Sequence, residues 1–296
     1  MTTAIDLSRL PVPNIIEEVD YEAILSEQLA DLSARFPGFD VPAESDPAHK
    51  ILEVTAYREL LVRQRVNEAA RAVMLAYALD EDLDNLGALF NVERLQTDPG
   101  NPGAIPPIQP SYESDAEFRR RILLSLQGLS TAGPEGAYIY HALSAEGGVL
   151  DASATSPAPG DVVVTVLARE GDGTPPAALL DAVDAAVSAD DVRPLTDHVI
   201  VQSAQVVTYA IAATLYFQPG PDSQVVLAEA QAAAEAYAEQ QHRLGLDVTL
   251  SGVYAALHRP GVQRVELANP TATITIAPDQ ASYCTGITLT DGGVDE

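Results

Sequence analysis

The sequence predicts a multidomain α+β protein, in which an N-terminal helical region with one long helix precedes two small α/β modules of strand–helix–strand order. Two observations lead to this prediction. Residues 48–79 contain no Pro or Gly and repeat apolar or small side chains at helical spacing. From residue 161 onward, β-branched runs alternate with Ala-rich stretches. Six segments are expected: an N-terminal helical region (1–95), a Pro-rich linker (96–110), a helical middle region (111–160), a first α/β module (161–204), a second α/β module (205–270) and a C-terminal strand with a tail (271–296).

Two helices are expected in the N-terminal region. Asp20 can cap a helix that begins at Tyr21 and ends at Pro37–Gly38. Asp46 can cap the long helix, and Pro47 occupies its first position, where the missing N–H costs nothing. A helix of roughly 30 residues is about 45 Å long. Because that exceeds what a globular core needs, we expect this helix in a bundle or an inter-subunit contact.

The middle of the chain begins with a stretch that has little to pack. Residues 96–110 hold five prolines and two glycines, which favours an extended linker. Ser114 and Glu117 then form the pattern of a capping box at the start of a helix. Gly133–Pro134 is typical of the start of another helix, and Gly147–Gly148 of its end.

The C-terminal half reads as two successive strand–helix–strand units. The expected strands are residues 162–168, 197–203, 206–217 and 262–267, and the expected helices are 176–189, 222–241 and 251–258. This order indicates either a weak internal duplication or two small modules of similar design. No basic residue follows Arg264, and the Thr- and Gly-rich end predicts a strand followed by a loose tail.

Composition disfavours several classes of function. The chain carries 43 acidic and 16 basic residues, a formal charge of −27. Such a charge repels phosphate backbones and anionic membrane surfaces, so we expect neither nucleic acid nor membrane as a partner. Cys284 is the single cysteine, which excludes an intrachain disulfide and a thiolate metal cluster. No segment has the roughly 20 apolar residues of a membrane span, and residues 1–10 do not resemble a secretory signal, so we expect folding in a reducing cytoplasm.

No motif predicts catalysis, a metal or a cofactor. Asp80, Asp82 and Asp84 start like a calcium loop, but Asn85 and Asn91 stand where that loop needs Gly and Glu. The histidines lie apart, and phosphate-loop, dinucleotide and hydrolase motifs are missing from the sequence. Among so many carboxylates, a pair suited to glycoside hydrolysis could always be arranged and carries no information. We expect neither catalytic residues nor cofactors.

Arginine placement is the one feature that indicates a binding surface. Arginine offers a planar fork of donors that suits carboxylates at interfaces. The partner-interface candidates on the long helix and in a later triplet are Arg58, Arg63, Arg65, Arg71, Arg119, Arg120 and Arg121. The alternative is a solvated helix surface with local pairs such as Glu59 to Arg63, each contributing a few tenths of a kcal/mol.

Five stretches follow one another along the chain: Leu52–Asn67 (LEVTAYRELLVRQRVN), Asp82–Arg94 (DLDNLGALFNVER), Ser114–Ile122 (SDAEFRRRI), Gly148–Val166 and Arg193–Val199 (RPLTDHV). In this order they resemble the baseplate J family of contractile-tailed phages. The resemblance runs from about Leu7 to Pro270. No single stretch is decisive, and their shared order gives the resemblance its strength.

The resemblance implies a structural wedge protein of the tail baseplate without catalytic residues. In that family, copies of the protein join each other and a smaller tail protein, and the wedges close a ring around the central hub and spike. A sheath-initiating wedge protein is a further expected partner, and the expected location is the virion, after synthesis in the cytoplasm of the bacterial host. Two other classes remain open: a tail-associated cell-wall hydrolase, and a soluble binding module that forms no ring.

Overall fold

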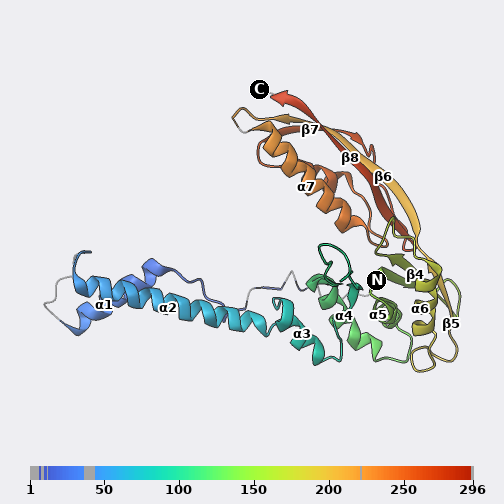
Figure 1. The fold of residues 1–296 in the computed structure, drawn as a ribbon, viewed down its shortest axis with the longest axis horizontal. Coiled ribbons are helices and arrows are strands. Elements are labelled where there is room, and N and C mark those ends of the chain that lie inside the picture. Colours follow the sequence, from blue (N-terminus) through green and yellow to red (C-terminus); the bar gives the residue numbers. More distant parts are fainter. Residues whose placement is uncertain (1–6, 8–9, 12, 37–43, 221, 295–296) are drawn as a thin grey trace. The chain divides into compact units, whose positions relative to one another are not determined.

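The computed structural model describes residues 7, 10–11, 13–36, 44–220 and 222–294. Among these residues it contains eight helices and eight strands, with helices alone in the N-terminal region and small sheets after it. The predicted α+β class is therefore confirmed. The described residues form two compact units, one up to Glu93 and one from Arg94 onward. Figure 1 shows the helices of the first unit in blue to cyan and the mixed helices and strands of the second in green to red.

Among its described residues, the first unit holds α1 (Tyr21–Arg35), α2 (Pro47–Ala72) and α3 (Asp80–Ala88). Both predicted caps are present. The Asp20 carboxylate accepts the backbone N–H groups of Glu22 and Ala23 at 2.7 and 3.1 Å. The Asp46 carboxylate accepts that of Ala48 at 2.8 Å, with Pro47 in the first turn. The predicted end of the first helix at Pro37–Gly38 lies outside the described residues.

The helices α1 and α2 pack along one face of each. Ile24 and Leu25 of α1 meet Ala56 of α2, which is completely buried. Around them lie the partly buried side chains of Val19, Tyr21, Leu29, Leu52 and Leu60. Because Ala56 has only a methyl group, α1 can approach α2 closely there.

The long helix is shorter than predicted. It ends at Ala72 instead of continuing to Leu79, and α3 begins at Asp80 after a turn. No Pro or Gly marks this end. Ala78 and Leu83, on the two sides of the new helix start, are both buried. Tertiary burial therefore overrides the helical propensity of residues 73–79.

The Pro-rich stretch is not an extended linker throughout. Its first residues form β1 (Gln96–Asp98), which pairs antiparallel with β2 (Ser111–Tyr112). The hydroxyls of Thr97 and Ser111 lie 2.9 Å apart across the pair. The Asp98 carboxylate accepts the Gly100 N–H at 2.7 Å, where Gly100 adopts a positive φ that glycine tolerates. This turn directs the chain back on itself, so that residues 96–112 form a hairpin.

The first sheet has the strand order β3 (Val149–Thr155), β4 (Asp161–Ala168), β5 (His198–Ser203). β3 runs antiparallel to β4, and β5 runs parallel to it after the crossover helix α6 (Ala177–Val187). The helices α4 (Asp115–Gly128) and α5 (Glu135–Ala145) precede the sheet. Side chains of α5 and α6 form one core with the sheet, including Tyr138, Ile139, Ala142, Leu179, Val183, Val187, Val164 and Val166. The middle region 111–160, predicted to be helical, therefore ends in the strand β3. The sequence of β3 has no dense β-branched run, because small Ala residues occupy the positions that face the core.

The second sheet has the order β7 (Val262–Asn269), β6 (Gln205–Phe217), β8 (Gln280–Val294). β6 runs antiparallel to β7 and parallel to β8. Alternate residues of β6 are buried from Tyr209 to Phe217, and they pack with α7 (Ser223–Gln241) and α8 (Leu250–Leu257). The expected C-terminal strand is present as β8 and continues to Val294, the last described residue. Each module therefore has three strands where two were predicted.

One residue separates the two sheets along the chain. The N–H of Ala204 donates to the Val166 carbonyl of the first sheet at 2.9 Å. The N–H of the next residue, Gln205, donates to the Asp279 carbonyl, beside the start of β8, at 2.9 Å. Ala204 is buried with Leu167 and Ala281 in a small apolar cluster. The step from one sheet to the other is thus made without a loop.

Candidate partner-binding surface

The helix α2 has a second apolar face that no described residue covers. Its large side chains keep between 40% and 64% of their surface exposed: Ile51, Val54, Tyr57, Leu61, Val62 and Val66. The buried Ala56 marks the opposite face, against α1. Single exposed apolar residues are ordinary, but a continuous row of them along one helix indicates an interaction site.

Two of the predicted arginines lie within this face. Arg58 and Arg65 fall between the apolar residues at helical spacing. The Arg58 side chain makes no hydrogen bond or ion pair among the described residues. Arg65 has only a long contact of 3.6 Å with Glu68, and its side chain is 82% exposed. We define these two arginines with Ile51, Val54, Leu61 and Val62 as the α2 outer face.

The other two arginines of α2 lie outside this face. Arg63 lies toward α1, where it binds the Glu59 carboxylate at 2.6 and 3.0 Å and approaches Glu17 at 3.7 Å. Hydrogen bonds from Gln28 and from Arg63 hold the pKa of the Glu59 carboxyl below its ordinary value. Arg71 is exposed near the end of the helix.

The triplet on α4 does not form an exposed arginine patch. Arg121 is 4% exposed, and its guanidinium binds both oxygens of the buried Glu113 carboxylate and the Ser144 hydroxyl. Arg120 donates to Asp151 of β3 at 2.8 Å, and Arg119 is partly buried. Arg120 and Arg121 are therefore both engaged within the chain, with Arg121 buried and Arg120 partly exposed, and their use as partner-interface residues stays a prediction. The buried acids that hold them lie outside the helical turn of each arginine, since Glu113 is 8 residues from Arg121 and Asp151 is 31 residues from Arg120.

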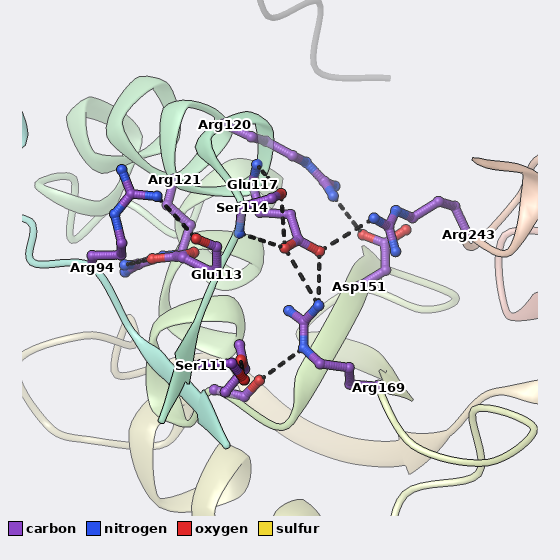
Figure 2. Close-up of polar contacts among 12 residues, drawn as sticks. Arg94, Ser111, Glu113, Ser114, Glu117, Arg120, Arg121, Asp151, Arg169 and Arg243 are labelled. Atoms are coloured by element: carbon purple, nitrogen blue, oxygen red, sulfur yellow. Dashed lines mark hydrogen bonds and ion pairs between the residues drawn. The ribbon is translucent and has the colours of Figure 1, made fainter. Parts of the chain in front are cut away.

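These ion pairs belong to a polar junction around the start of α4 (Figure 2). The Glu117 carboxylate accepts from Arg169, just after β4, at 3.1 and 3.3 Å. It also accepts from Arg243, just after α7, at 3.3 Å. The Asp151 carboxylate accepts from Arg120 and from the Leu244 N–H, the latter at 3.0 Å. Two carboxylates thus join α4, the first sheet and the segment that follows α7, which packs with the second sheet.

The Glu117 carboxyl is held ionised. Burial raises its pKa, but Arg169 and the hydrogen bonds from Ser114 outweigh burial, so its pKa lies below the ordinary value. A cavity of about 500 Å³ lies beside it, lined also by Arg169, Glu239, His242 and Arg243. A glycosidase acid needs a carboxyl whose pKa is raised. Glu117 has the opposite property, so it does not fit the role of that acid.

Metal-binding clusters and membrane-spanning helices are both lacking among the described residues. None of their His, Cys, Asp and Glu side chains gather in threes in a way that could hold a metal ion. Asp80 and Asp82, two of the three acids that resemble a calcium loop in sequence, instead lie in the first turn of α3, where the helix dipole favours negative charge. None of the described helices combines the length and the apolar character needed to cross a bilayer.

Comparison with known proteins agrees with this architecture. Three family models match in order: the baseplate J-like N-terminal domain at residues 44–101, the central domain at 130–203 and the C-terminal domain at 209–290. The central match ends at the last residue of β5, and the C-terminal match falls within the second module. Baseplate protein J of Escherichia phage P2 is 50% identical over 299 residues, which cover 99% of each chain. The chain therefore belongs to the baseplate J family of phage tail proteins.

Proposed function

We propose that this protein is a structural subunit of the baseplate wedge of a contractile phage tail. In this role it joins other copies of itself, a smaller tail protein and the sheath-initiating wedge protein, in a ring around the hub and spike. Membership of the family supports the baseplate location, and the ring and its partners are our inference. The protein does its work by contact and not by catalysis.

The observation that carries the proposal is the α2 outer face. A helix that leaves one apolar face against α1 and a second one open needs another chain to cover it. The modules from Arg94 onward have their own cores, so assembly through α2 leaves them intact.

The experiment compares two variants of the full chain co-expressed with the other baseplate proteins of the same particle. Val54→Asp combined with Val62→Asp places two carboxylates on the outer face, at side chains that are 61% and 63% exposed. Burying these charges against an apolar partner is strongly unfavourable, so we expect this variant to fold and to be lost from the assembled wedge. Gln64→Asp, on an exposed part of the same helix outside the face, is the matched control and should assemble normally.

Negative-stain imaging and co-purification report the result. Rings with the wild type and with the control, and none with the double variant, support the proposal. Normal rings from the double variant would show that the face is not used in assembly. A wild type that only forms a simple complex with its neighbours would favour a soluble binding module instead.

A further inference from the structure

The α2 outer face has the spacing of a coiled-coil seam. Ile51, Val54, Arg58, Leu61 and Arg65 follow one another at steps of three, four, three and four residues. In a coiled coil such positions face the partner helix, and each side chain enters a space between four residues of that helix. Two of the five seam positions are arginines, seven residues apart. A docked helix would cover both guanidinium groups.

A covered guanidinium needs a carboxylate. A buried charge without a partner is strongly destabilising, whereas a close and well-formed pair is tolerated or favourable. The nearby acids of α2 are already engaged. Lys50 binds both oxygens of Glu53 at 2.8 and 2.9 Å. Arg63 and Gln28 bind Glu59. Arg58 has no partner among the described residues, and Arg65 has only the long, exposed contact of 3.6 Å with Glu68, so the docked helix must supply carboxylates for both.

A second copy of α2 in parallel register does not meet this need. Equivalent seam positions face each other in that arrangement, which places Arg58 against Arg58 and Arg65 against Arg65. Like charges brought together in a covered seam oppose association. The formal charge of −27 on each chain adds a further repulsion between copies.

We propose that the α2 outer face binds an amphipathic helix of a different protein, which places two carboxylates, seven residues apart, against Arg58 and Arg65. This inference rests on the proposed function and specifies the chemistry of the partner. The apolar seam residues supply affinity, and the two ion pairs select the partner and set its register.

The test measures binding of the full chain to three helical peptides of equal length, stapled to keep them helical, by fluorescence anisotropy. The first carries leucines at the apolar seam positions and glutamates at the two positions facing the arginines. The second has leucines in place of the glutamates. The third is the α2 sequence itself, residues 47–72. We expect the glutamate peptide to bind at least about tenfold more tightly than either of the others.

The variant Arg58→Met/Arg65→Met completes the design, because methionine keeps an apolar stem and removes the charge. It should lose affinity for the glutamate peptide and gain affinity for the leucine peptide. Two outcomes would overturn the inference: equal binding of the glutamate and leucine peptides to the wild type, or strongest binding of the α2 peptide. Either outcome would still show that the α2 outer face binds a helix. If no peptide binds, both the inference and the docking face fail. The wedge assembly of the Val54→Asp/Val62→Asp variant then decides whether the proposed function fails with them.

Discussion

The arginines of α2 and α4 look alike in sequence and differ in what surrounds them. Arg121 and Arg120 are held by Glu113 and Asp151, both of which are buried. Arg58 extends from an exposed helix with no partner in the described chain, between apolar residues that are themselves uncovered. The first pair stabilises the fold, whereas the second position is available for assembly. A cluster of arginines therefore indicates that ion pairs form there. Only the location of the acidic residues shows whether these pairs form within the chain or with another chain.

The sharpest test of this difference is one substitution made at two places. Arg121→Met leaves the Glu113 carboxylate buried without its guanidinium, and breaking a buried pair in this way costs about 3–5 kcal/mol. Arg58→Met removes an exposed side chain without a partner and should change the free energy of unfolding by less than about 0.5 kcal/mol. Urea unfolding of the isolated chains measures both. Equal losses in the free energy of unfolding would mean that Arg121 and Arg58 do not differ in having a partner within the chain.

The polar junction can be tested at its buried acceptor. Asp151→Asn keeps the shape of the side chain but removes the charge that binds Arg120 and presents an amide nitrogen to one of its donors. We expect a loss of about 1–3 kcal/mol in the free energy of unfolding. Limited proteolysis should cut earlier near Arg243, because the Leu244 N–H loses its charged acceptor. Asp181→Asn, a change of the same kind at the exposed side of α6, is the control and should have little effect.

A smaller effect is expected from pH. The pKa of the Glu117 carboxyl is below its ordinary value in the folded chain, so its contribution to stability is complete above the unfolded pKa of about 4.3. That contribution is lost as the pH falls through the folded pKa. Glu117→Gln should therefore lower Tm at neutral pH and flatten the fall of Tm in acid. A variant whose Tm falls with acid as steeply as the wild type would show that Glu117 does not contribute to this dependence.

The smallest effect is expected within α2, where the arginine has a local partner. Arg63→Met removes the pair with Glu59 on a partly exposed surface, where water screens the two charges, so we expect only a small loss of stability. Differential scanning calorimetry in low and high salt should show a small loss of Tm that salt reduces, because mobile ions screen exposed pairs. A loss of Tm that does not depend on salt would mean that the Arg63–Glu59 pair behaves like the buried ion pairs of α4.

Structure that depends on residues close together in the sequence could be predicted, and structure that depends on distant residues could not. The capping box of Ser114 and Glu117 was predicted and is present, because both residues lie within one helical turn. The second role of Glu117 depends on Arg169 and Arg243, which lie 52 and 126 residues away. The same limit applies to β3, whose small residues gave no strand pattern, and to the end of α2, which lacks a Pro or Gly. Of the seven arginines, the sequence could name the candidates but could not locate the acids that engage Arg120 and Arg121.

The single residue between the two sheets has a mechanical consequence. Ala204 connects β5 to β6 without a flexible loop, since its own N–H and that of Gln205 bond to different sheets. A pull along β6 therefore reaches β5 directly through the backbone. β5 is bonded to β4, and β6 to β8, by parallel ladders, in which hydrogen bonds follow one another along the strands. Such ladders are loaded in shear, so their bonds must give way together instead of one after another. The unit can thus transmit tension from one sheet to the next without first stretching a loop.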